Sequence, residues 1–505
     1  MSASLRIGLL LALLAPAVAV AAPDTGIPAP TPAPLPFAAP PLAVEGPLDS
    51  TIRLELFNRI RGEFVDWFAP QPGAVAPTYR YDFVGNKFQL GVRITREPYE
   101  LFAQFQDSSL GNLPDDGVGV GSIYYANVNR TTQNGTILRN AWLSTSRLFG
   151  VQGLSLKGGR QLYSDGAEAK AQSPTLKWVQ QSRIGQRLVG PFEYTHVGRS
   201  FDGGTVAYGG ERGNVTAFFF KPTFGGYDVN ANPELNINLA GLSLNLNEVK
   251  NAPSALLENS IARLFWLYYD DDRDVLFLDN RPLAVRQADR GKPAILNTVG
   301  ASFARVEAVG PGNADALLYG FGQQGEWQSQ THSAWAYGVE GGYRLTGLWS
   351  APWMRVGINS GSGDTDPNDD VHQTFFQMLP TAWLYAQFPF YNMMNNQDVF
   401  AQWILDPHPM LNFRLDFHWL RVNSGNDLAY FGGGATKNNF FGFGGVPANQ
   451  HNELAYLVHF LLTVRPTAFL TFSAFYGHAF GQGVISQTFA GNEGNYGYLE
   501  ALLAF

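Results

Sequence analysis

Arginine supplies most of the positive charge in this sequence, at 26 of the 34 basic residues. A guanidinium is a planar fork that binds carboxylate or phosphate oxygens through paired hydrogen bonds, whereas lysine is a point charge. Several of these arginines share the polar face of alternating segments: Arg53, Arg59, Arg61, Arg93, Arg344, Arg355, Arg414 and Arg465. Lys87 and five carboxylates lie on the same faces: Glu55, Glu63, Glu340, Asp416 and Glu453. Such residues could form successive binding sites along which an anion passes, or they could stabilise the fold through ion pairs with each other. A single arginine fits either interpretation equally well, and the set as a whole favours the first.

The segments that carry these residues alternate between apolar and polar side chains. Ile52 and Leu54 face one way, and Arg53 and Glu55 face the other. The same period of two recurs at 87–94, 335–344, 354–359, 412–419 and 453–465. Because strand side chains point alternately to two faces, each segment is predicted to be a strand with one apolar and one charged face. The pattern predicts an all-β fold, a single-chain transmembrane antiparallel β-barrel of roughly 16 to 18 strands.

Polar stretches separate the predicted strands. The longer ones lie near 108–135, 165–198, 223–258, 270–296, 360–380, 423–451 and 481–494, and 465–468 has the composition of a tight turn. Long loops on one rim and short turns on the other are typical of bacterial barrels. Between 300 and 400 the alternation is weaker, and the pattern does not assign the faces of the strands there.

The two ends of the chain point to the bacterial envelope. Arg6, an apolar run at 7–15 and the small residues at 19–21 predict a cleavable secretory signal peptide over 1–22. The stretch 23–48 is rich in Ala and Pro and is predicted to be a periplasmic linker, which leaves 49–505 for the barrel. The chain ends on Phe505, and an alternating last strand with a terminal aromatic resembles the signal read by the barrel assembly machinery.

Composition narrows the class of protein further. The chain has no cysteine, which excludes a disulfide framework and thiol chemistry. Aromatic residues make up 14% and charged residues 15% of the chain. After the predicted signal there is no apolar run of about 18 residues, which argues against a helical membrane protein. Interfacial girdles of Trp, Tyr and Phe in a membrane barrel explain the aromatic content.

One segment carries a specific resemblance. Gly159-Arg160-Gln161, then 186–191 (QRLVGP) and 198–203 (GRSFDG), are similar to a pattern of the alginate export family of outer-membrane porins. The stretches 360–364, 374–380 and 477–480 are similar to that family more weakly, whereas 386–391 departs from it. The likeness spans about 50–505 and favours a barrel of about 18 strands with loops partly folded into the lumen. By motif match it implies that Arg160, Arg187, Arg199 and Asp202 lie near an arginine-lined constriction.

The resemblance and the charge pattern together predict a monomeric channel in the outer membrane of a Gram-negative bacterium. We expect it to export or pass anionic solutes, with a polyuronate such as alginate as one example. Its partners would be outer-membrane lipid and an anionic polysaccharide or other anionic solute. A general non-selective porin and an outer-membrane barrel hydrolase are the alternatives.

Other constellations point elsewhere with less weight. Asp364, Asp366, Asn368 and Asp370 offer hard oxygen ligands at alternate positions, as in a calcium loop, but glycine and glutamate are missing where a helix-flanked loop needs them. A solvated acidic loop is the favoured interpretation, so no cofactor is expected. His418 shares a face with Asp416, and neither lies in a recognisable nucleophile motif, so no catalytic residue is predicted. No nucleotide loop or nucleic-acid patch is present.

Overall fold

The computed structural model describes residues 42–249, 254 and 257–505, and within them the chain forms a closed antiparallel β-barrel of 18 strands. The first strand closes the barrel on the last, with Ile60 of β2 opposite Ala501 of β22. The predicted barrel and its even strand number are confirmed. The barrel strands are β2 (Ser50–Asp66), β3 (Arg80–Arg96), β4 (Tyr99–Gly111), β5 (Gln133–Thr145), β6 (Leu154–Gln161), β7 (Phe201–Gly209), β8 (Gly213–Pro222), β9 (Ile237–Leu246), β10 (Ser260–Asp271), β11 (Ala294–Val309), β12 (Gly312–Trp327), β13 (Gln330–Arg344), β14 (Trp353–Gly361), β16 (Asn396–His408), β17 (Leu411–Arg421), β20 (Glu453–Thr467), β21 (Leu470–Gly481) and β22 (Glu493–Ala504).

The remaining elements lie in the connections. They are β1 (Ala43–Gly46), β15 (Val371–His372), the hairpin of β18 (Leu428–Gly432) and β19 (Phe443–Pro447), and α1 (Val120–Val128), α2 (Pro174–Val179), α3 (Leu283–Ala288) and α4 (Gly483–Thr488). Single turns are η1 (Pro47–Asp49), η2 (Leu148–Gly150), η3 (Gln180–Ile184) and η4 (Ala382–Leu384). None of the helices in the described part of the chain is long and apolar enough to cross a membrane.

The predicted signal peptide lies outside the described residues, as does the predicted linker up to residue 41. The end of that linker needs a correction. Ala43–Gly46 form strand β1, which pairs with the start of β2, so the last residues before the barrel are not without structure. Residues 50–53 of β2 precede its pairing with β22, which begins at Phe57, and β1 pairs with β2 there.

The strands are apolar outside and polar inside. On β2, Leu54, Ile60 and Phe64 are 44%, 50% and 43% exposed, whereas Arg59 and Arg61 are buried. A soluble barrel would show the reverse, and this arrangement is the one a bilayer requires. The faces of β13 follow the same rule, and they are those that the alternation of 335–344 predicts, since Val339 is exposed and Glu340 is buried.

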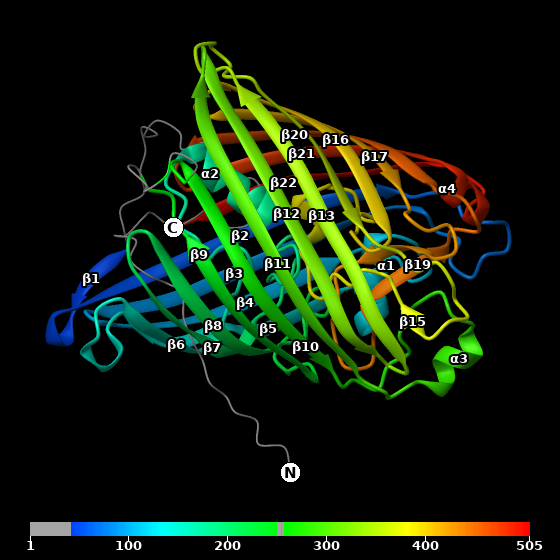
Figure 1. Ribbon diagram of the computed structural model, residues 1–505, viewed down its shortest axis with the longest axis horizontal. Coiled ribbons are helices and arrows are strands. Elements are labelled where there is room, and N and C mark those ends of the chain that lie inside the picture. The colour runs from blue at the N-terminus through cyan, green and yellow to red at the C-terminus, as the bar shows by residue number, and fades with distance from the viewer. Residues whose placement is uncertain (1–41, 250–253, 255–256) are drawn as a thin grey trace.

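Short and long connections lie at opposite ends (Figure 1), with β1 and the C-terminus at one end and α1, α3 and α4 at the other. The predicted connections agree with this except for 223–258, which contains strand β9. Two long connections, 162–200 and 362–395, fold into the barrel, and nearly all residues of 187–200 and 374–396 are buried. They join each other there: the Gly190 amide donates to the Leu379 carbonyl at 2.9 Å, and the Leu379 amide donates to the Leu188 carbonyl at 2.9 Å. We call these two segments the inward loops.

Candidate functional site: the inward loop and its arginines

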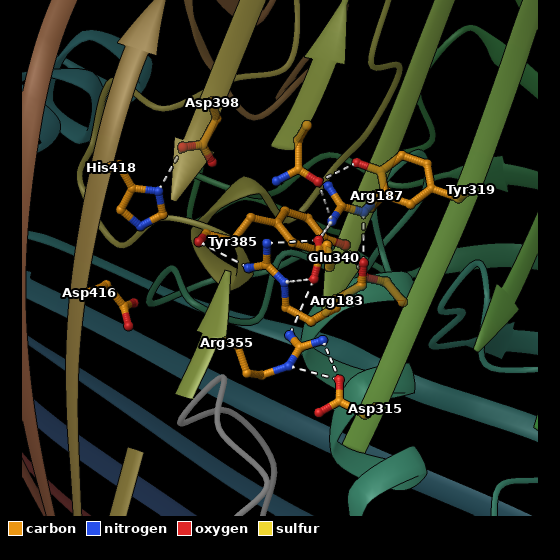
Figure 2. Close-up of polar contacts among 12 residues, drawn as sticks. Arg183, Arg187, Asp315, Tyr319, Glu340, Arg355, Tyr385, Asp398, Asp416 and His418 are labelled. Atoms are coloured by element: carbon orange, nitrogen blue, oxygen red, sulfur yellow. Dashed lines mark hydrogen bonds and ion pairs between the residues drawn. The ribbon is translucent and has the colours of Figure 1, made fainter. Parts of the chain in front are cut away.

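A buried carboxylate fixes the inward loop 162–200 to the barrel wall. Glu340 of β13 accepts hydrogen bonds from Arg183 Nε and Nη2 at 2.8 and 2.9 Å and from Arg187 Nη2 at 3.1 Å. Arg355 of β14 donates to the same carboxylate at 3.2 Å. Figure 2 shows the three guanidinium groups converging on this one side chain. Charge-assisted bonds of this kind are roughly twice as strong as neutral ones, so Glu340 is the anchor of the loop.

The surroundings of this anchor fix each arginine in place. Arg355 also donates to Asp315 from Nε at 3.1 Å and from Nη2 at 2.8 Å. The Arg187 guanidinium lies 3.8 Å from the ring centroid of Tyr385 and 4.4 Å from that of Tyr319. Stacking on two aromatic faces replaces part of the hydration that a buried cation loses. Three arginines contact two carboxylates here, and the charge of Asp398 also acts on Arg183.

A second contact holds the same loop against β2 and β3. Arg59 donates to the backbone carbonyls of Glu193, Tyr194 and Thr195 at 3.0, 3.2 and 2.7 Å. Arg61 donates to Glu500 of β22 at 2.8 Å, and Lys87 forms an ion pair with Glu193 at 2.8 Å. Glu193 also pairs with Arg139 of β5. The wall cations of this contact therefore bind the loop itself.

Arg199 differs from the other buried arginines of the loop. Its Nη2 donates to the Gly433 carbonyl, whereas Nε and Nη1 have no hydrogen-bond partner. Among the described residues it forms no ion pair with a carboxylate. Burial lowers the pKa of Arg199 to about 9, and the charges of Arg139 and Arg273 act in the same direction. The guanidinium stays protonated at neutral pH, and two of its nitrogens are buried without an acceptor.

The remaining predicted residues lie apart from this centre. Arg160 forms a two-pronged pair with Asp202 on the neighbouring strand at 2.7 and 2.5 Å, and both are only partly exposed. Three more arginines form ion pairs on the wall: Arg93 with Glu55 and Glu100, Arg344 with Asp406, and Arg414 with Asp416. Arg53 and Arg465 are half-buried and form no ion pair in the described structure. The structure thus brings Arg187, Arg355, Arg59, Arg61 and Arg199 to the inward loop, and leaves the rest on the wall.

The buried interior as a whole is not basic. Among the described residues, 15 carboxylates and 12 basic side chains are buried. Any preference for anions must therefore arise locally, at the inward loop 162–200. The sequence analysis did not identify four residues that contact the predicted arginines or the inward loop 162–200: Arg183, Arg139, Asp315 and Glu193. The signal for Asp315 was weak, because its strand lies where the alternation is blurred, and the loop residues have no periodicity to mark them.

The carboxylates of the predicted acidic loop bind backbone amides within the loop itself. Asp364 Oδ1 accepts the Asp366 amide at 3.1 Å, and Asp366 Oδ1 accepts the Asn368 amide at 3.0 Å, so these carboxylates cap local turns. In the described chain, the one group of three or more potential ligands that lies within reach of a single ion is elsewhere. Asp364 is instead fully buried beside Asp427, whose Oδ2 accepts the Asp364 amide at 2.9 Å.

The pair of Asp364 and Asp427 predicts a pH-dependent contact between the connections 362–395 and 422–452. Burial raises the pKa of each carboxyl group to about 6. Both groups bind a proton more tightly in the folded protein than in the unfolded chain, where Asp titrates near about 4. The free energy of unfolding therefore falls as the pH rises from about 4 through about 6, and the contact is weaker at neutral pH.

A pair of spin labels tests this. The chain has no cysteine of its own, so Asn368→Cys with Asn439→Cys gives labels on the two connections only. We expect the distance distribution between them to broaden between about pH 5 and about pH 7.5. Asp427→Asn should remove most of this dependence. A distribution that narrows as the pH rises, or one that Asp427→Asn leaves unchanged, would contradict the assignment.

Comparison with known proteins agrees with this architecture. The family model described as alginate export matches residues 258–452. That match includes the 360–380 motifs and leaves out the 159–203 motif, and it is shorter than the predicted span. No curated protein matches the chain.

Solved structures match over nearly the whole barrel. The structure of Acinetobacter baumannii OccAB2 has 10% identity and a TM-score of 0.57, and covers 90% of this chain and 98% of its own. Pseudomonas aeruginosa OccK2 (OpdF) in complex with glucuronate has 10% identity, a TM-score of 0.52 and the same coverage. P. aeruginosa OpdK with vanillate has 11% identity, a TM-score of 0.51 and again 90% and 98% coverage. The chain therefore has the fold of the outer-membrane porins, with a sequence similar to the alginate export family over residues 258–452.

Proposed function

We propose that the protein is an outer-membrane channel for anionic solutes, and that these pass the inward loop 162–200 at Arg199. The observation that carries the proposal is the Arg199 guanidinium, which is buried inside the barrel with two nitrogens that bind no other group. A buried cation without a counter-ion is costly, and a passing carboxylate would offset that cost.

Sugar acids of the uronate class are the favoured solutes. A uronate carries one carboxylate per ring, which matches the fork of a guanidinium. The similarity to the alginate export family and the glucuronate bound to the related barrel of OccK2 make this class the first to test.

Planar bilayer recording tests the proposal. The refolded chain should conduct, its reversal potential in a salt gradient should report a preference for anions, and oligouronates should block the current. A neutral polysaccharide of the same length is the control, and it should block far less. A chain that does not conduct would overturn the channel. Equal block by both polymers would indicate a general non-selective porin, and release of product from an ester substrate would favour the hydrolase.

A further inference from the structure

A second polar centre lies on the barrel wall away from Arg199. Asp416 and His418 of β17 point into the barrel, and His459 of β20 lies directly opposite Asp416 in the strand register. All three side chains are buried, and one potential ligand atom of each lies within 4.8 Å of those of the other two. Figure 2 shows Asp416 and His418 on the same strand, with His418 turned toward Asp398.

The imidazole nitrogens of this centre lack partners. Neither ring nitrogen of His459 has a hydrogen bond, and Nε2 of His418 has none. Leaving a buried polar group unsatisfied is costly, so native proteins rarely keep several together without a ligand or an ordered water. The neighbouring strand makes room for the His459 ring: Gly477 lies opposite it, and a Cβ there would be 3.2 Å from His459 Cδ2.

The groups around the centre prepare the ring of His418 for a ligand. Asp398 Oδ1 lies 2.9 Å from His418 Nδ1. A carboxylate at this nitrogen holds the proton there, which leaves the lone pair of Nε2 pointing into the centre. Arg414 orients Asp416 through both of its oxygens, donating from Nε to Oδ1 at 2.9 Å and pairing through Nη2 with Oδ2 at 2.5 Å. With neutral imidazoles, the two carboxylates and the one arginine leave a net charge of −1, which favours a cation.

We propose that Asp416, His418 and His459 bind one divalent transition-metal ion of the zinc class. Two imidazoles and a carboxylate are ligands that such ions prefer, whereas Ca²⁺ and Mg²⁺ prefer sets made of oxygen alone. The ion would join β17 to β20 and leave a coordination position toward the lumen. Near that position lie Phe388 and Tyr391 of the inward loop 362–395. The site does not depend on the proposed transport function.

Equilibrium dialysis with Zn²⁺ alone tests the site in the refolded full chain in detergent, after treatment with a chelator. We expect one ion per chain. His459→Gln and His418→Gln should each abolish stoichiometric binding. His408→Gln is the matched control, because His408 is exposed at the end of β16, and it should bind as the unaltered chain does. Asp398→Asn should weaken binding about 10- to 100-fold, as loss of an outer partner does.

A second variant keeps the test decisive if His459→Gln does not fold. His459→Cys replaces one ligand by another in a chain without cysteine. Loaded with Co²⁺, it should show a thiolate-to-metal charge-transfer absorption that the unaltered chain lacks. The proposal is overturned if this band is absent, if His459→Gln retains the full stoichiometry, or if His408→Gln lowers it as much as the wall histidines do.

Discussion

Glu340→Gln is expected to lower the free energy of unfolding by about 3–5 kcal/mol, the usual cost of removing one partner from a buried ion pair. The substitution keeps the shape of the side chain and removes the charge on which Arg183, Arg187 and Arg355 converge. Asp315, which pairs with Arg355, would then be the one carboxylate among the described residues in direct contact with the three buried guanidinium groups. Like-charge repulsion in a dry interior should push the inward loop 162–200 away from the wall.

Urea unfolding followed by tryptophan fluorescence measures this effect, because Trp178 of α2 and Trp353 of β14 touch at the anchor, with ring centroids 4.7 Å apart. Bilayer recording should show a larger and noisier current as the loop detaches. Glu326→Gln on β12 is the control, since that side chain is exposed, and it should leave both readouts unchanged. An unaltered urea midpoint in Glu340→Gln would show that the loop is held by its other contacts.

The anchor illustrates what the sequence could and could not predict. Strand alternation placed Glu340 and Arg355 on the polar face, and the structure agrees. Alternation could not identify their partner, because Arg183 lies in a loop 157 residues away and loops have no period. The same holds for Arg59, whose acceptors are backbone carbonyls that any residue would provide.

The blurred region from 300 to 400 has a physical cause as well. The connection 362–395 folds into the barrel, so its apolar residues, such as Phe375 and Met378, are buried although they lie outside any strand. The composition of this connection is therefore not that of a polar loop. The sequence predicts only part of the histidine centre. Alternation places Asp416 and His418 on one face, but it does not indicate that β20 pairs with β17.

Arg199→Gln should reduce the preference for anions about fivefold in permeability ratio, which corresponds to a loss of about 1 kcal/mol of attraction for a hydrated anion passing the charge. The reversal potential in a salt gradient measures it. Block by oligouronates should weaken further, because the neutral amide offers no charge-assisted bonds. Arg199→Lys separates charge from shape: it should keep the ion preference and lose part of the block, since an ammonium lacks the fork.

Arg290→Gln is the control for net charge, because Arg290 is exposed at the rim and paired with Asp274. It should leave the reversal potential nearly unchanged, and an equal shift in both variants would show that the local site is not responsible. The free energy of unfolding distinguishes a binding role of Arg199 from a structural one. Arg199 is buried without a carboxylate, so removing its charge should leave the urea midpoint unchanged or raise it, the opposite of Glu340→Gln. If the charge of Arg199 lowers the free energy of unfolding, its presence on the inward loop is better explained by anion binding than by an ion pair that stabilises the fold. A fall of the midpoint in Arg199→Gln would reverse that conclusion.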